Sequence, residues 1–126
     1  MQNKVFIVSA VRTPLGCFMG SLSNFSAVDL GIYALDGAVS KIDFDRKEID
    51  ELIIGHVFQS GCGQAPAKQI ALGAKLGPEI PCSSVNKVCS SGLKAVNLAA
   101  QSIQLGINEI VVAGGVESMS LSLIHI

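Results

Sequence analysis

Cys89 is the side chain of this protein that is best placed to act as a nucleophile. It lies in residues 86–92, which read Asn-Lys-Val-Cys-Ser-Ser-Gly and separate a short apolar run from a stretch of helical periodicity. Apolar residues then recur at the spacing of one helix face, at Leu93, Val96, Ala100 and Ile103. At the start of a helix, unpaired backbone N–H groups and the positive end of the dipole favour the thiolate, the nucleophilic form. Local context alone leaves a buried structural cysteine equally open.

The other three cysteines, Cys17, Cys62 and Cys82, lack the pattern of a metal site or a disulfide framework. The sequence contains no Cys-x-x-Cys pair, and no histidine lies at the spacing of a zinc ligand. Because no signal peptide is recognisable either, we expect reduced thiols in an intracellular compartment. We interpret these three cysteines as small apolar fillers, although Cys82 lies close to Cys89 in the sequence.

The composition excludes several classes of function. The 126 residues predict one domain, 49% of them are hydrophobic and only 15% are charged. No apolar run reaches 18 residues, so a membrane-spanning helix is not expected. The net charge is -1 and no basic cluster is present, which argues against nucleic acid as a partner. The apolar excess instead predicts burial against a second domain or a partner subunit.

Strands and helices are predicted to alternate along the chain. Short apolar runs predict buried strands at residues 5–8, 52–55, 81–85 and 110–113. A capping-box pattern at Ser26 opens one helix, whose apolar face consists of Val28, Ile32, Leu35 and Val39. Pro66 suits the first turn of another helix that runs to about Leu76, and residues 43–50 form a charged connector or a short turn of helix. This alternation is typical of an α/β layer fold.

Four segments, in order, resemble the thiolase family. The nucleophile segment of thiolases is similar to residues 86–96, which read Asn-Lys-Val-Cys-Ser-Ser-Gly-Leu-Lys-Ala-Val. The turn after their first strand is similar to residues 10–16, Ala-Val-Arg-Thr-Pro-Leu-Gly. A helix-opening loop is similar to residues 63–69, Gly-Gln-Ala-Pro-Ala-Lys-Gln, and a glycine-rich segment to residues 113–120, Ala-Gly-Gly-Val-Glu-Ser-Met-Ser. The residues of these segments resemble those of the acetyl-CoA acetyltransferase (acetoacetyl-CoA thiolase) branch of the family most.

The resemblance implies an α/β fold that forms the N-terminal half of the thiolase fold, a layered α/β structure with a mixed central sheet. Residues 1–120 would be the thiolase N-terminal domain, incomplete as a whole enzyme. Residues 121–126 are an atypical apolar tail, which we interpret as a truncation junction. The family is oligomeric, so a homodimer or homotetramer is expected for a full-length protein. Cytoplasm is the default compartment, with mitochondrial and peroxisomal locations left open.

The implied chemistry is acyl transfer through a thioester on Cys89. Two molecules of acetyl-CoA would give acetoacetyl-CoA plus CoA, or the reverse. Coenzyme A thioesters would be substrates, and no separate cofactor or metal is expected. The backbone N–H of Cys89 would stabilise a developing oxyanion. Covalent catalysis of this kind divides one difficult step into two easier ones.

The acid–base groups that thiolases carry in their second half have no counterpart in this sequence. The two histidines present are His56, inside or just after the second strand, and His125, near the end. Nothing in the sequence places His56 within hydrogen-bond distance of Cys89 as a replacement base. An alternative is therefore an inactive truncated fragment that acts only by pairing with full-length thiolase subunits. A redox sensor based on Cys89 is a third interpretation, but it lacks a resolving cysteine.

Overall fold

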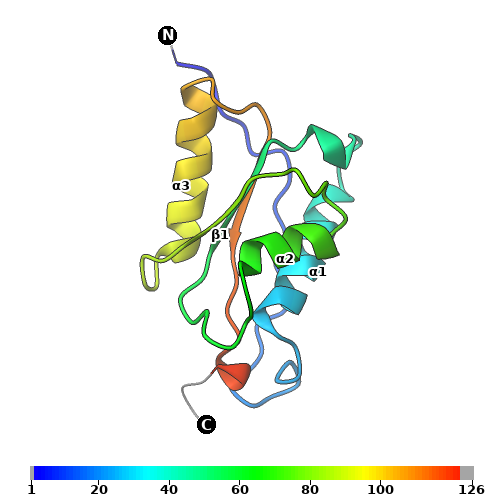
Figure 1. Cartoon of the computed structure of the whole chain (residues 1–126), viewed down its shortest axis with the longest axis vertical. Helices are drawn as coiled ribbons and strands as arrows, with labels where there is room; N and C mark the ends of the chain where they lie inside the picture. Colours follow the sequence, from blue (N-terminus) through cyan, green and yellow to red (C-terminus); the bar gives the residue numbers. More distant parts are fainter. Residues whose placement is uncertain (1, 123–126) are drawn as a thin grey trace.

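The protein folds as a parallel sheet with helices on both faces. The computed structural model describes residues 2–122 (Figure 1). In chain order the elements are α1 (Ala27–Val39), η1 (Arg46–Glu48), β1 (Glu51–Gly55), α2 (Pro66–Gly73), β2 (Cys82–Val85), α3 (Ser91–Gln104), β3 (Val111–Gly115) and η2 (Met119–Leu121). The strand order is β2-β1-β3, with β1 parallel to both neighbours. The predicted α/β class is confirmed, and the strands of residues 2–122 include no antiparallel member of a mixed sheet.

The two faces of β1 build two separate parts of the core. Leu52 and Ile54 pack among the side chains of α1 and α2, whereas Ile53 packs against Ala95 and Ala99 of α3. This division follows from the alternation of side chains along a strand. Figure 1 shows the result, with α3 on one side of the sheet and α1 and α2 on the other. The continuous apolar run at residues 52–54 therefore reads as a strand that is buried on both faces.

Local sequence accounts for the beginnings of α1 and α2. Ser26 and Asp29 form the predicted capping box, because Ser26 Oγ accepts from the Asp29 N–H at 3.0 Å and Asp29 Oδ2 accepts from the Ser26 N–H at 2.9 Å. Pro66 occupies the first turn of α2, as expected. α2 is shorter than predicted, since it ends at Gly73 instead of about Leu76. Lys75 adopts a left-handed φ of 61°, which ends the helix before Gly77 and Pro78 are reached.

The predicted strand at residues 5–8 is wrong. These residues belong to no strand, and three of their side chains are largely exposed, with exposed fractions of 74% for Phe6, 80% for Ile7 and 70% for Val8. A strand needs a neighbouring backbone, and no strand of residues 2–122 pairs with this segment. The flanking residues make isolated bonds instead, such as that from the Ser9 hydroxyl to the Ala38 carbonyl at 2.8 Å.

The remaining predicted elements are present, but α3 packs through an unexpected face. The strands at 52–55, 81–85 and 110–113 appear as β1, β2 and β3. α3 buries Ser91, Ala95 and Ala99. Leu93 and Val96, which the periodicity assigned to the apolar face, are 65% and 38% exposed. Small side chains allow the helix backbone to approach the sheet closely, whereas Leu98 packs at the edge of this contact and Leu93 and Val96 are exposed.

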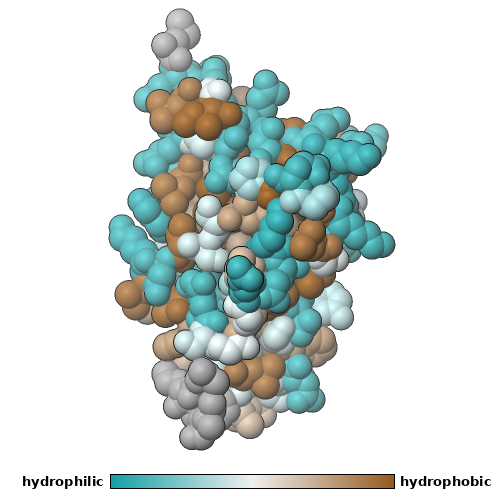
Figure 2. Space-filling view, in the orientation of Figure 1, coloured by the Kyte–Doolittle hydropathy of each residue, from teal (hydrophilic) through white to brown (hydrophobic). Residues whose placement is uncertain are grey.

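Apolar side chains also reach the surface elsewhere, as the brown areas of Figure 2 show. The exposed apolar residues include the N-terminal Phe6, Ile7 and Val8, and Leu105 and Ile107 after α3. Among residues 2–122, no helix is long and apolar enough to cross a membrane. These surfaces are of the kind that proteins cover through association.

Candidate active site

Cys89 lies in the tight turn that joins β2 to α3. β2 ends at Val85 and α3 begins at Ser91, so only residues 86–90 connect the two elements. Within this turn Val88 has a φ of 50°, a left-handed conformation that β-branched residues rarely adopt. The Cys89 side chain is exposed and its thiol is free. The structure therefore places the predicted nucleophile at the surface, which excludes the buried structural cysteine as its description.

The N-terminus of α3 has no side-chain cap. Ser90 occupies the N-cap position, but its hydroxyl donates to the Lys87 carbonyl at 2.9 Å and caps no N–H of the helix. The first N–H groups of a helix have no partners within the helix, and the dipole adds positive potential there. This end of α3 is thus suited to an anion or to a developing oxyanion beside Cys89.

Glycines at the ends of two strands allow the first turn of α3 to pack closely against the sheet. A Cβ built on Gly55, the last residue of β1, would overlap the backbone of Ser91 and Gly92. A Cβ on Gly115, the last residue of β3, would lie 3.1 Å from the Cα of Gly92. The start of α3 is therefore pressed against the carboxyl ends of β1 and β3. The sequence signal was a glycine at the end of each apolar run.

A buried histidine and a glutamate lie at this same edge of the sheet. His56 follows β1, its side chain is fully buried, and its Nε2 lies 3.5 Å from Oε1 of Glu117. Both Glu117 oxygens also accept backbone N–H groups, from Val57 and from Phe58, each at 3.1 Å. Burial lowers the pKa of His56, and the charge of Glu117 partly opposes that shift. The neutral ring is therefore favoured at neutral pH.

The structure does not bring His56 onto the thiol of Cys89. Within residues 2–122, the His56 ring nitrogens have no hydrogen-bond partner. His125 lies outside the described residues. Sequence reasoning identified Cys89 and considered His56, but it missed Glu117 and the buried Ser91. A carboxylate two residues after the Gly-Gly of β3 was the available signal for Glu117.

The other three cysteines differ from Cys89 in exposure or in the pKa of the thiol. All four thiols, every one of them in the described part of the chain, are free. Cys17 is exposed, whereas burial raises the pKa of Cys62 and of Cys82. A raised pKa leaves less thiolate at neutral pH. Residues 2–122 contain no group of three or more His, Cys, Asp or Glu side chains suited to a metal ion.

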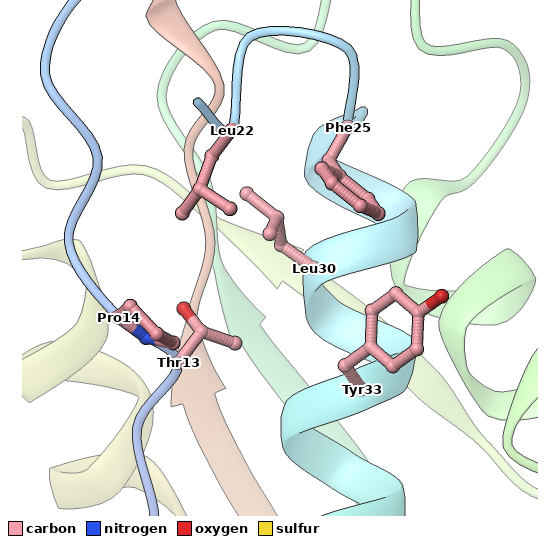
Figure 3. A pocket seen from close by; sticks show the side chains of 6 residues that line it. All are labelled: Thr13, Pro14, Leu22, Phe25, Leu30 and Tyr33. Carbon is pink, nitrogen blue, oxygen red and sulfur yellow. The ribbon is translucent and has the colours of Figure 1, made fainter. Parts of the chain in front are cut away.

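A small apolar cavity of about 150 Å³ lies between the N-terminal segment and α1 (Figure 3). Its lining is formed by Thr13, Pro14, Leu22, Phe25, Leu30 and Tyr33. Figure 3 shows Pro14 and Thr13 on one wall, with Leu30 and Tyr33 projecting from the helix opposite. None of its residues belongs to the Cys89 turn, so this cavity is separate from the site described above.

Comparison with known proteins decides the family. The model of the thiolase N-terminal domain matches residues 5–125. The chain belongs to the thiolase family. The mitochondrial acetyl-CoA acetyltransferase of Bos taurus is 49% identical over 94% of this chain and 28% of its own length. The acetyl-CoA acetyltransferase of Saccharomyces cerevisiae is 52% identical over 95% of this chain and 31% of its own length.

Solved thiolase structures agree with this assignment. The Acat5 thiolase of Ascaris suum, solved in complex with coenzyme A, matches with a TM-score of 0.89 and 44% identity over 90% of this chain and 30% of that one. The acetyl-CoA acetyltransferase of Bacillus anthracis matches with a TM-score of 0.88 and 41% identity over 92% of this chain and 29% of that one. The chain thus spans under a third of the length of these thiolases.

Proposed function

We propose that this thiolase chain provides the nucleophile half of an acetyl-CoA acetyltransferase, with Cys89 as the residue that carries the acyl group. The observation that carries the proposal is the exposed Cys89 thiol beside the uncapped N-terminus of α3, seated on Gly55 and Gly115. The names of the similar proteins, and the coenzyme A in the Ascaris suum structure, support the substrate class.

In the first half-reaction the Cys89 thiolate attacks the carbonyl carbon of acetyl-CoA. A C–S bond to Cys89 forms, the carbonyl oxygen becomes an oxyanion near the α3 N-terminus, and CoA then leaves as a thiolate. In the second, a further acetyl-CoA loses a proton from its methyl carbon. The resulting carbanion attacks the thioester, which forms the C–C bond of acetoacetyl-CoA and returns Cys89 as a thiolate. Coenzyme A thioesters are substrates throughout, and the scheme needs no metal or other cofactor.

Within residues 2–122 no hydrogen bond joins the exposed, free Cys89 thiol to a base, and the buried His56 ring has no hydrogen-bond partner, so the proton transfers require groups from elsewhere. The family resemblance assigns these groups to the second half of a full-length thiolase, which would also complete a homodimer or homotetramer. On this proposal, residues 1–120 belong to the thiolase N-terminal domain. Curated relatives include both mitochondrial and cytosolic forms, such as the cytosolic enzyme of Gibberella zeae, and cytoplasm is the proposed compartment.

The alternative is an inactive fragment that pairs with full-length thiolase subunits. The exposed apolar residues at the N-terminus and on α3 favour some form of association. The acyl-transfer proposal accounts for more, because an exposed thiol at an uncapped helix start is not needed for pairing alone.

A substitution at Cys89 tests the proposal directly. In the full-length protein, Cys89→Ser should lower acetoacetyl-CoA formation by about three orders of magnitude or more, because a serine hydroxyl stays protonated there. Incubation with labelled acetyl-CoA, followed by peptide mass spectrometry, should place the acetyl group on Cys89 alone. Cys17→Ser is the matched control, since Cys17 is also an exposed free thiol, and it should leave turnover unchanged. Acetylation of Cys17, Cys62 or Cys82 in place of Cys89 would falsify the assignment.

A further inference from the structure

Ser91 is a buried polar residue whose hydroxyl bonds only to the turn that carries Cys89. It begins α3, two residues after Cys89, and is 5% exposed. The Lys87 N–H donates to Ser91 Oγ at 2.8 Å, and the Ser91 hydroxyl donates to the Val88 carbonyl at 2.6 Å. One side chain therefore binds the two residues that directly precede the nucleophile.

The turn needs such support because of its backbone conformation. Val88 is held at a φ of 50°, a region that a β-branched residue avoids and that persists only where the surroundings enforce it. The Asn86 side chain accepts the Val88 N–H at 2.9 Å, and the Ser91 hydroxyl binds the Val88 carbonyl. Both polar groups of the strained residue are thus occupied within the turn.

The backbone of Ser91 is also held in place by the sheet. The ends of β1 and β3 press on this part of the helix, since a Cβ on Gly55 would overlap the Ser91 backbone. The Ser91 hydroxyl therefore links a rigid sheet edge to a strained turn, and Cys89 lies at the end of that link. A small displacement of a reacting group is enough to slow a reaction strongly.

We propose that Ser91 is a positioning residue, whose hydroxyl holds the 86–90 turn so that the Cys89 thiol meets its acyl donor in a reactive orientation. This proposal rests on the acyl-transfer function proposed above. Serines near a helix start often make local bonds of this kind without any role in chemistry, so the test has to separate position from stability.

Ser102 provides a matched control on the same helix. It is partly buried, and its hydroxyl donates to the Ala99 carbonyl at 2.9 Å, three residues back, as Ser91 does to Val88. Like Ser91 Oγ, its Oγ also accepts one N–H, from Asn108 Nδ2 at 3.3 Å. It lies three turns further along α3. Ser91→Ala and Ser102→Ala therefore remove the same kind of bond, one beside Cys89 and one far from it.

The experiment is single-turnover acetylation of Cys89 by acetyl-CoA in the full-length protein. Ser91→Ala should lower the maximal acetylation rate by about tenfold or more, with the half-saturating acetyl-CoA concentration changed by less than about twofold. Ser102→Ala should change neither. Equal rates in the two variants, or a loss that appears only in the half-saturating concentration, would overturn the role of Ser91.

A double-mutant cycle with Val88→Asn covers the case in which Ser91→Ala is also less stable. Asparagine tolerates the left-handed region better than valine does, so the conformation of the turn should depend less on the hydrogen bonds of the Ser91 hydroxyl. The Ser91→Ala loss should then be smaller in the Val88→Asn background than in the wild type. A loss of the same size in both backgrounds would contradict the proposal.

Hydrogen exchange separates this inference from the function on which it rests. Ser91→Ala should speed the amide exchange of residues 86–90, where Lys87 loses its acceptor, and Ser102→Ala should not. If the wild type is not acetylated at Cys89, the proposed function fails. If exchange in the turn is unchanged by Ser91→Ala, the bracing role of Ser91 fails whatever the wild type does.

Discussion

At the scale of single residues, His56 is an unusual interior group. Its ring lies at the carboxyl end of β1 with no exposed surface, 3.5 Å from a carboxylate oxygen of Glu117. That carboxylate is already engaged by the N–H groups of Val57 and Phe58. Because the ring is out of water and weakly partnered, a proton on it is costly. The ring is therefore a sensitive reporter of the packing at the end of β1.

The buried ring gives the stability of the protein a defined pH dependence. Burial lowers the pKa of His56 in the native state below its ordinary value of 6.5. Well above pH 6.5 the ring is neutral in both native and unfolded states, and its contribution to stability is constant. As the pH falls below 6.5, the unfolded state takes up a proton before the native state does, so the free energy of unfolding decreases.

We therefore expect His56→Asn to flatten this part of the stability profile. Urea unfolding between pH 7.5 and pH 5.5 should show a smaller loss of stability in the variant than in the wild type. His125→Asn, a change at the other histidine of the sequence, is the control for histidine content. Parallel profiles for the wild type and His56→Asn would show that the ring does not titrate in this way.

At the scale of elements, the contact between α3 and the strand ends sets the geometry of the site. Gly55 and Gly115 allow the backbone of the first turn of α3 to lie against β1 and β3. The buried side chains of α3 are correspondingly small: Ser91, Ala95 and Ala99. The glycines of the strands and the small side chains of α3 together allow the two backbones to approach closely. This contact places the 86–90 turn at the carboxyl edge of the sheet.

Gly55→Ala should destabilise the protein, because its Cβ would meet the backbone of Ser91 and Gly92, which cannot rotate away. The expected loss is about 1–3 kcal/mol in the free energy of unfolding. Gly37→Ala is the matched control, since it lies inside α1 and its Cβ would lie 4.0 Å from the nearest other atom, Cγ2 of Val11. That variant should gain about 0.5–1 kcal/mol from helix propensity. Denaturant unfolding measures both, and a neutral Gly55→Ala would contradict the tight contact.

The sequence predicted the elements better than it predicted their packing. The capping box at Ser26, Pro66 in the first turn of α2 and the apolar strand at 52–54 are local signals, and the structure confirms all three. The segment at 5–8 carries the same apolar signal but forms no strand, because a strand depends on a distant partner. The prediction of the buried face of α3 was also wrong. Periodicity gives weight to large apolar residues, whereas the close contact between helix and sheet requires small ones.

Prediction of the candidate site was limited in a similar way. Cys89 stood out from its place before a helix, and the structure puts it at the surface of that turn. Ser91 and Glu117 did not stand out, because their partners are backbone groups. Lys87 and Val88 lie close to Ser91 in the sequence, but Val57 and Phe58 are about sixty residues from Glu117. Contacts of the second kind emerge only once the strand order is known.

At the scale of the whole molecule, several large apolar side chains lie exposed at the surface. Three consecutive apolar residues at the N-terminus, Phe6, Ile7 and Val8, are each at least 70% exposed. Leu93 and Val96 face outward on α3, next to the turn that holds Cys89. Such surfaces suit burial against further protein, which agrees with a chain that spans only 28% to 31% of its curated relatives.

We expect the 126-residue chain, expressed alone, to be inactive and to self-associate. Turnover should be absent because residues 2–122 supply no acid–base partner to Cys89, so slow, stoichiometric acylation is the most that the thiol can achieve. Association should follow from the exposed apolar residues, and Ile7→Ser should reduce it, whereas Lys41→Ser, also at an exposed position, should not. Light scattering after size exclusion measures the mass, and an acetoacetyl-CoA assay measures turnover. A monodisperse monomer with sustained turnover would refute both expectations. It would mean that this chain alone supplies the catalytic acid and base and exposes no surface that drives association.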